Sequence, residues 1–184
     1  KRPEYMVLSK VDDLKKFLEK KITIIAGPGT TNYSRLNEIL EIIYNDETNL
    51  ILDAACIEIV KSKKFSSLPI ITPHEGEAAK LLGINVDEIS NKREYYAQKI
   101  SDKFSVITVL KGYETIITDG NKIYICKDGD SSLAFAGSGD ILAGLIGSFL
   151  AQGTKRIDSC LLGVSLHAYS ATKSKLKRGL TANE

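Results

Sequence analysis

A run of small residues, Gly137-Ser138-Gly139, directly precedes Asp140 and an apolar stretch that reaches Gly153. This pattern predicts a glycine-rich turn that leads into a helix. The free N–H groups and the dipole of such a helix start form an anion hole, and phosphate is its usual occupant. A carboxylate at this point would repel phosphate unless it had another task. Asp140 therefore has two interpretations: a helix N-cap, or a catalytic base beside a bound phosphate.

Other residues able to do chemistry follow short apolar runs. Gly27-Pro28-Gly29 follows ITIIA, Asp53 follows LIL, His74 comes shortly after PII, and Lys111-Gly112 follows SVITVL. Such runs are typical of buried parallel strands, and parallel α/β sheets bind ligands beyond the carboxyl ends of their strands. We therefore expect these clusters to share one edge of a sheet, together with the glycine-rich helix start.

Each of these residues also has a purely structural interpretation. Glu77 lies three positions after His74, so both can face one cleft. A solvated glutamate and a satisfied loop histidine are the structural alternatives, and for His74 the location after a strand favours function. Lys111 would place a mobile positive charge near a phosphate. For Asp53 we favour a structural role, and for His167 a place in the packed core.

Some of the functional alternatives have no support in the sequence. The chain has no Ser–His–Asp arrangement and no GxxxxGK[ST] sequence. A phosphate hole, a carboxylate, a lysine and glycine turns suit phosphoryl transfer from a nucleotide, with Asp140 as the base that accepts the proton of the acceptor hydroxyl. Thr115 could add a hydroxyl to this site.

Alternating buried strands and amphipathic helices predict an α/β fold with a mostly parallel sheet and helices on both faces. A β-hairpin is expected near the C-terminal third, around the turn at Asp119-Gly120. The expected strands span 22–26, 50–52, 68–71 and 105–110, with the hairpin at 114–118 and 122–127. The expected helices span about 11–18, 36–43, 56–64, 75–82, 96–104, 140–153 and 157–178.

The length of 184 residues fits one domain, and the net charge of +2 with interleaved acids and bases does not favour nucleic acid or a membrane surface as partner. The apolar stretches are too short to span a bilayer, and we find no signal-peptide pattern. The three cysteines are widely spaced and fit no metal pattern, so free thiols and a cytoplasmic location are expected.

Taken together, ITPHEGEAAKLLG, VLKGYETI and AGSGDILAGLIGSFLAQG resemble the ADP/ATP-dependent NAD(P)H-hydrate dehydratases, a carbohydrate-kinase-like family of the ribokinase-like superfamily. RPEYMV, IAGPGTT and LDA have counterparts in the same order. The resemblance implies a ribokinase-like fold and repair of hydrated NADH or NADPH. ADP or ATP would phosphorylate the hydroxyl at C6 of the ring, and phosphate would then be eliminated.

The resemblance also implies roles for single residues. Asp140 would be the catalytic base and would bind the hydrated cofactor together with Gly29 and His74. Glu77 would act on Mg²⁺ through water. The protein is expected to be a homo-oligomer. The residues expected to bind the nucleotide are Lys111, Gly112, Tyr113, Glu114, Thr115, Gly137, Ser138 and Gly139.

The chain departs from the family pattern near the glycine-rich run. Gly129-Asp130-Ser131-Ser132 stands where Asn-Pro is usual, and Phe135 replaces a common threonine. Lys1 falls partway into the family's domain, so the single domain 1–184 is expected to lack its N-terminal segment.

The sequence is also compatible with three functions other than the dehydratase. The first is a ribokinase-like small-molecule kinase for a hydroxymethylpyrimidine or thiazole alcohol. His74 occupies the position where hydroxymethylpyrimidine kinases carry asparagine, which favours the dehydratase. The second is a non-catalytic nucleotide-binding module, and the third is an α/β domain whose glycine turns are only structural.

Overall fold

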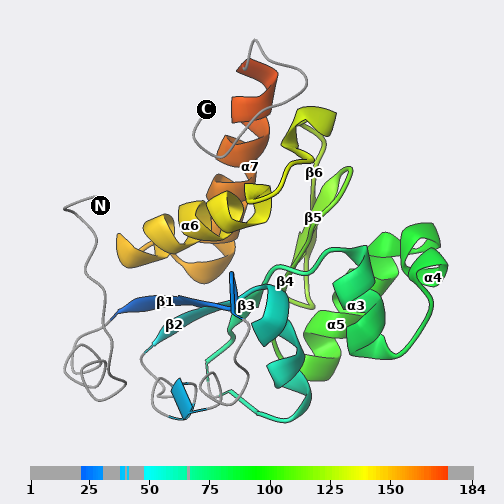
Figure 1. Cartoon of the computed structure of the whole chain (residues 1–184), viewed down its shortest axis with the longest axis vertical. Coiled ribbons are helices and arrows are strands. Elements are labelled where there is room, and N and C mark those ends of the chain that lie inside the picture. The colour runs from blue at the N-terminus through cyan, green and yellow to red at the C-terminus, as the bar shows by residue number, and fades with distance from the viewer. Residues whose placement is uncertain (1–21, 31–37, 40, 42–47, 66, 174–184) are drawn as a thin grey trace.

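The computed structural model describes residues 22–30, 38–39, 41, 48–65 and 67–173. Its centre is a six-stranded sheet whose strands lie side by side in the order of the sequence (Figure 1). The first four strands are parallel, and the last two pair antiparallel as a hairpin. This arrangement confirms the predicted mostly parallel sheet and its hairpin. The strands are β1 (Thr23–Ala26), β2 (Asn49–Leu52), β3 (Ile70–Ile71), β4 (Ile107–Leu110), β5 (Thr115–Thr118) and β6 (Ile123–Cys126).

Helices cover both faces of the sheet, as predicted (Figure 1). One face carries η1 (Ala54–Lys61), α3 (Glu75–Leu82), α4 (Val86–Asn91) and α5 (Arg93–Phe104). The other carries α6 (Ser138–Ala151) and α7 (Arg156–Lys173), which follow the short η2 (Ser131–Leu133). The expected helix at 11–18 and most of the one at 36–43 lie outside the described residues. No helix in the described part of the chain combines the length and apolar character that a membrane crossing requires.

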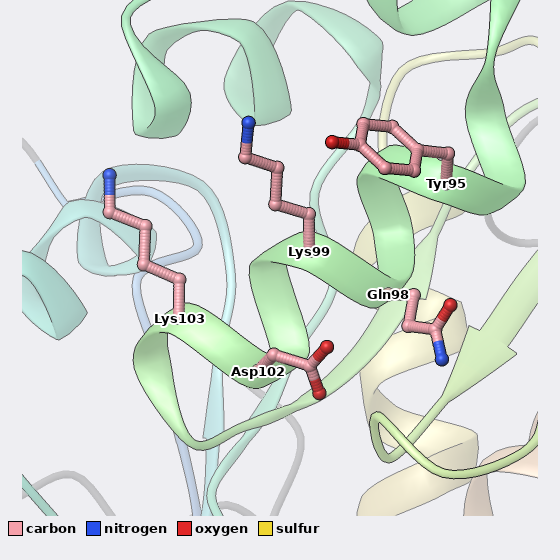
Figure 2. Close-up of a pocket in the computed structure, with 5 residues that line it drawn as sticks. All are labelled: Tyr95, Gln98, Lys99, Asp102 and Lys103. Atoms are coloured by element: carbon pink, nitrogen blue, oxygen red, sulfur yellow. The ribbon is translucent and has the colours of Figure 1, made fainter.

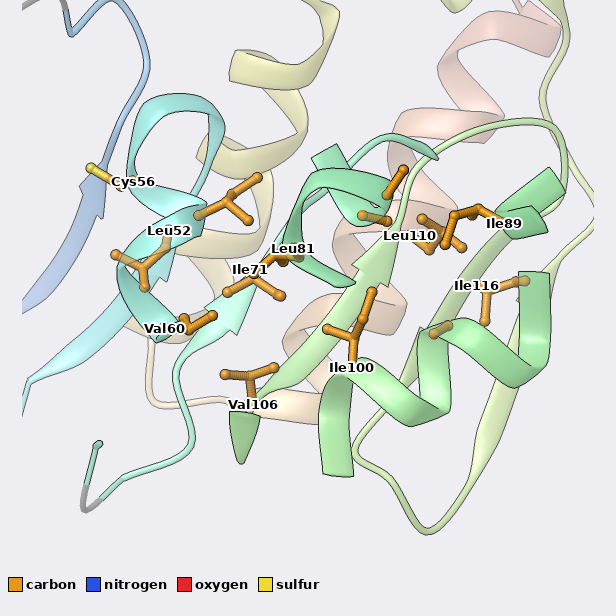
Figure 3. Close-up of a cluster of buried hydrophobic side chains, with 14 of the residues drawn as sticks. Leu52, Cys56, Val60, Ile71, Leu81, Ile89, Ile100, Val106, Leu110 and Ile116 are labelled. Carbon is orange, nitrogen blue, oxygen red and sulfur yellow. The ribbon is translucent and has the colours of Figure 1, made fainter. Parts of the chain in front are cut away.

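The central strands are buried on both faces, which is why they read as continuous apolar runs. Successive residues of a strand point to opposite faces. Ile51 and Ile70 therefore pack against α6 and α7, whereas Leu52 and Ile71 pack in the cluster under η1, α3 and α5 (Figure 3). Two cores of this kind fix the sheet between its helical layers.

Three elements differ from the prediction. The helix expected at 56–64 is a 3₁₀ helix that begins at Ala54. The strand expected at 68–71 is regular only at Ile70–Ile71. The Pro69 carbonyl still accepts from the Ile107 N–H at 2.9 Å, but Pro69 has no N–H to donate to the ladder. The helix α4 was not predicted, although Asn85 and Glu88 have the spacing of a capping box and the Asn85 N–H donates to Glu88 Oε1 at 3.1 Å.

The three cysteines are free thiols, as predicted. Cys56 and Cys160 are buried in the two cores. Burial, helped by the nearby Asp53 carboxylate, raises the pKa of Cys56 to about 11. Burial also raises the pKa of Cys160 far above its usual range. Buried thiols of this kind are inert packing residues rather than nucleophiles.

Candidate active site

The carboxyl ends of the parallel strands bring the predicted residues to one edge of the sheet. The backbone pairing continues just past the strands, because the Asp53 N–H donates to the Ala26 carbonyl at 3.0 Å. In the same way the Lys111 N–H donates to the Pro73 carbonyl at 2.8 Å, next to His74. The residues that follow β1, β2, β3 and β4 therefore lie together, as the alternation of strands and helices predicts.

A charged cluster occupies this edge. The Lys111 Nζ lies 2.9 Å from Asp53 Oδ1 and 3.9 Å from Glu77 Oε2. The Asp53 side chain is only 3 % exposed, and those of Lys111 and Glu77 are about one-fifth exposed. A Cβ on Gly139 would lie 3.3 Å from the Lys111 amine and 3.8 Å from Asp53 Oδ2. The start of α6 therefore contacts the ion pair directly, and no side chain separates them.

Asp53 pairs with Lys111 rather than capping a helix. It precedes η1, but its side chain makes no capping hydrogen bond there. Its carboxylate instead holds the Lys111 amine at the sheet edge. Sequence reasoning gave no signal for this pairing, because the two residues are 58 positions apart.

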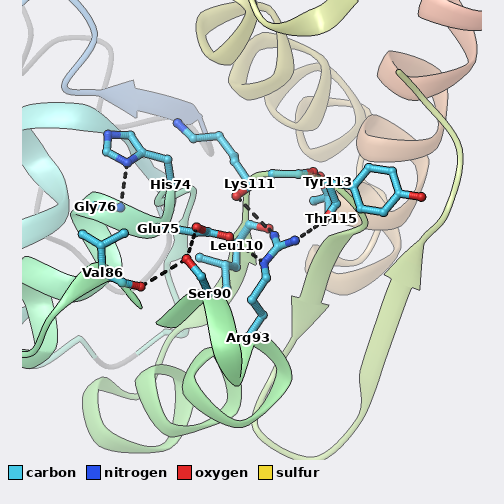
Figure 4. A network of polar contacts seen from close by, with 11 residues as sticks. His74, Glu75, Gly76, Val86, Ser90, Arg93, Leu110, Lys111, Tyr113 and Thr115 are labelled. Atoms are coloured by element: carbon cyan, nitrogen blue, oxygen red, sulfur yellow. Dashed lines mark hydrogen bonds and ion pairs between the residues drawn. The ribbon is translucent and has the colours of Figure 1, made fainter. Parts of the chain in front are cut away.

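His74 and Glu77 cap α3 reciprocally. The His74 Nδ1 accepts from the N–H groups of Gly76 at 3.0 Å and Glu77 at 3.3 Å (Figure 4). The Glu77 carboxylate accepts from the His74 N–H at 2.8 Å. This capping box holds the Glu77 carboxylate near Lys111, so it is not a solvated surface residue, while the His74 ring stays 61 % exposed beside it.

The geometry at the start of α6 contradicts the interpretation of Asp140 as the N-cap. The N-cap is Gly137, with a φ of +92°, so Asp140 is the third residue of the helix and is exposed. The N-cap interpretation of Asp140 is therefore wrong. A carboxylate in the first helical turn is favoured by the dipole, and here it directly follows Gly139, where a Cβ would lie 3.3 Å from the Lys111 amine.

His167 links α7 to this helix start. Its Nε2 lies 3.1 Å from the Ser138 Oγ, and its ring is half-buried. Burial lowers the pKa of His167, and the hydrogen bond with Ser138 offsets only part of that effect. A neutral histidine therefore anchors the first residue of α6. The sequence predicted a packed core residue and missed this contact.

Two glycine turns border the site. Gly27 has a φ of +124°, and a Cβ there would lie 1.7 Å from the Asp53 carbonyl oxygen, so its structural role is established. Gly29, two residues later, is exposed. The second turn runs from Lys111 to Thr115. Its Tyr113 is 81 % exposed, and the Thr115 hydroxyl donates to the Gly112 carbonyl at 3.2 Å.

The two departures from the family pattern lie close to α6. Asp130 caps η2 by accepting from the Ser132 N–H at 2.9 Å. The Phe135 carbonyl accepts from the Ser138 N–H at 3.2 Å. Asp130 and Phe135 therefore both form hydrogen bonds with nearby residues, and Phe135 contacts the start of α6 through its backbone.

A surface hollow of about 510 Å³ lies elsewhere, on the outer face of α5 (Figure 2). It contains none of the residues discussed above, so its size does not mark the site. The residues that line it are Tyr95, Gln98, Lys99, Asp102 and Lys103.

Comparison with known proteins places these observations in a family. The sequence model of a family described as NAD(P)H-hydrate dehydratase matches residues 2–184. The bifunctional NAD(P)H-hydrate repair enzyme Nnr of Coxiella burnetii is 32 % identical over 190 aligned residues, which cover 100 % of this chain and 39 % of that protein. The chain therefore spans about two-fifths of the length of this curated relative.

Solved structures agree with the fold. The ADP/ATP-dependent NAD(P)H-hydrate dehydratase of Bacillus subtilis, co-crystallized with ATP/Mg²⁺, is 26 % identical with a TM-score of 0.79, over 93 % of this chain and 67 % of that chain. A ribokinase-like superfamily protein of Enterococcus faecalis has a TM-score of 0.79 at 24 % identity, over 92 % of this chain and 62 % of that chain. The expected ribokinase-like fold is confirmed.

Proposed function

Because the chain belongs to the NAD(P)H-hydrate dehydratase family, we propose that it restores NADH or NADPH from their hydrates at the expense of ADP or ATP. The ring hydroxyl at C6 attacks the terminal phosphate of the nucleotide, so that ATP leaves as ADP, or ADP as AMP. The phosphate then leaves with the C6 oxygen while a proton leaves C5, which restores the ring double bond. The observation that carries the proposal is the Lys111 amine, 2.9 Å from Asp53 and 3.9 Å from Glu77, against the glycine-rich start of α6.

The nucleotide phosphates would bind between α6 and the turn after β4. The first N–H groups of a helix have no intrahelical partner and point at such a ligand. Gly137 and Gly139 would supply them, whereas the Ser138 N–H already donates to the Phe135 carbonyl and Ser138 would contact the phosphate through its side chain. The lack of a side chain on Gly139 lets the phosphate approach both the backbone and the Lys111 amine. The turn from Lys111 to Thr115, with Gly112, Tyr113 and Glu114 between them, would hold the rest of the nucleotide.

Asp140 would act as the general base. Its carboxylate is exposed at the third position of α6, so a substrate hydroxyl can reach it while phosphate lies on the backbone of the preceding turn. Taking the hydroxyl proton as the oxygen attacks phosphorus is the usual role of a carboxylate in phosphoryl transfer. The exposed Gly29 and His74 at the same sheet edge would bind the hydrated cofactor.

The donors at this edge fit a magnesium ion held mainly by phosphates. Mg²⁺ commonly takes one or two protein carboxylates, several waters and substrate phosphates. Within the residues that the structure describes there is no cluster of three or more His, Cys, Asp or Glu able to hold a metal alone. Glu77 is the fitting donor, acting through water, and the ion would neutralise charge on the phosphates.

The proposal extends to the oligomeric state, the location and the partners of the enzyme. Exposed apolar side chains at Leu162, Leu166 and Tyr169 on α7 support a homo-oligomer. The free thiols support a cytoplasmic location. The modest net charge of +2 supports a small-molecule enzyme without a nucleic-acid or membrane partner.

The test is a spectroscopic assay of the chain with hydrated NADH, Mg²⁺ and ADP or ATP. We expect the absorbance of the reduced nicotinamide ring to return only when a nucleotide is present. Asp140→Asn should lower turnover at least about 100-fold, the usual contribution of a general base, with an unchanged melting temperature. Asp158→Asn is the matched control, because Asp158 is an exposed acid in the first turn of α7.

Other outcomes would replace the proposal. Phosphorylation of a pyrimidine or thiazole alcohol without dehydration would identify a small-molecule kinase. Nucleotide binding without any turnover, unchanged in Asp140→Asn, would identify a binding module.

A further inference from the structure

Arg93, the first residue of α5, connects three parts of the chain beside the candidate site (Figure 4). Its Nε lies 3.0 Å from the Oε1 of Glu75, the first residue of α3. Its Nη2 lies 3.4 Å from the carbonyl oxygens of both Leu110 and Lys111. Its Nη1 donates to the carbonyl of Tyr113. One guanidinium therefore reaches three backbone carbonyls at the end of β4 and the turn that follows.

The turn that Arg93 contacts has an unusual backbone. Gly112 has a φ of +146° and Glu114 a φ of +56°, values that L-residues other than glycine seldom adopt. A Cβ on Gly112 would lie 2.7 Å from Arg93 Nη2, so the guanidinium packs directly on the turn. The forked donors of arginine suit this task, because several N–H groups can reach separate carbonyls at once.

Glu75 holds the guanidinium from the opposite side. Its Oε1 pairs with Arg93, and its Oε2 accepts from the Ser90 hydroxyl of α4 at 2.6 Å. The Arg93 side chain is only 16 % exposed. Glu75 is also two positions before Glu77, so the same contact ties the start of α3 to the turn that carries Lys111. The Glu77 carboxylate and the Lys111 amine, which lie beside Asp53, are thereby fixed relative to each other.

We propose that Arg93 is a positioning residue for the nucleotide. It holds the turn from Leu110 to Tyr113 in the shape that directs the Lys111 amine toward Asp53 and the start of α6. Its guanidinium contacts Glu75 and three backbone carbonyls of this segment, so it acts through the shape of the turn. The inference rests on the proposed function, which gives this turn its nucleotide.

The test compares Arg93→Gln and Arg93→Lys with the wild-type chain. Calorimetric titration with Mg-ADP and Mg-ATP should show a Kd raised about tenfold or more in Arg93→Gln, equivalent to about 1.4 kcal/mol. In the dehydration assay the KM for nucleotide should rise similarly, while kcat at saturating nucleotide stays within about twofold. The KM for the hydrate should not change. Lys99→Gln, an exposed change on the same helix, is the control.

Arg93→Lys keeps the charge beside Glu75 but cannot reach three carbonyls with a fork. An affinity between those of wild type and Arg93→Gln is expected, and this variant decides the matter if Arg93→Gln does not fold. Wild-type nucleotide affinity in a folded Arg93→Gln or Arg93→Lys protein would overturn the inference. A lower kcat and melting temperature together with a rise in both KM values would also overturn it, since that is what a purely structural arginine would give.

Direct binding separates this inference from the proposed function. A wild-type chain that binds nucleotide but never dehydrates the hydrate refutes the function, and the Kd values of the variants still decide the role of Arg93. A wild-type chain that binds neither nucleotide overturns both.

Discussion

Replacing Lys111 by methionine should destabilise the protein because it leaves a buried carboxylate alone. Asp53 is 3 % exposed, and the Lys111 amine lies 2.9 Å from it. At an effective dielectric constant of about 20, charges at that distance attract by about 6 kcal/mol before the cost of removing them from water is subtracted. Removing one partner of a buried pair costs roughly 3–5 kcal/mol. Since Lys111 is 21 % exposed and water screens the pair, we expect the lower value.

The assay is urea unfolding followed by circular dichroism without nucleotide. Lys111→Met should lower the free energy of unfolding by about 3 kcal/mol. Adding Asp53→Asn removes the stranded charge, so the double variant should regain at least about 1.5 kcal/mol of that loss. Lys103→Met, an exposed change on α5, should stay within about 0.5 kcal/mol of wild type.

Two results would refute this reasoning. The first is a Lys111→Met protein as stable as the Lys103→Met control. The second is a double variant no more stable than Lys111→Met, because the lost stability would then come from the lysine stem rather than from an unpaired Asp53.

Two further predictions concern α6 and α7. A Cβ on Gly163 would lie 2.6 Å from the Cγ1 of Ile146, so Gly163→Ala should push the helices apart and lower the free energy of unfolding in urea by about 1–3 kcal/mol. Gly144→Ala, where the space is open, should be neutral or stabilising, and equal effects would contradict the packing argument. Burial lowers the pKa of His167 from 6.5, so its contribution to stability is present above the unfolded pKa and is lost as pH falls through the folded one. In a plot of melting temperature against pH, His167→Gln should flatten the slope between about pH 7 and 5. Equal slopes in wild type and variant would contradict this prediction.

The positions of the site residues along the sheet were predictable from the sequence. Continuous apolar runs of four or five residues mark strands buried on both faces. Parallel strands end at one edge, so the groups after them, such as Asp53 and Lys111, had to lie near one another. The turn at Asp119-Gly120 marked the hairpin. These features depend on local pattern alone.

The partners of these side chains were not predictable. Asp140 had the residue type of an N-cap, yet Gly137 takes that position because its left-handed backbone lets the chain turn into α6. Arg93 lies before the helix expected at 96–104 and had no predicted role, because its contacts are 17 to 20 positions away and depend on how α5 packs beside β4. The bond between His167 and Ser138 likewise depends on the crossing of two helices.

The order of strands across the sheet bears on how the protein is made. Each described strand pairs with its predecessor in the chain, so no strand has to insert between two earlier ones. During synthesis the sheet can grow from β1 to β6 by adding to an existing edge, with short closures each time. Helix α6 then returns to pack on β1 and β2, a contact of high sequence separation that forms late. A nascent chain can therefore assemble the Lys111 edge of the sheet before the start of α6 packs against it.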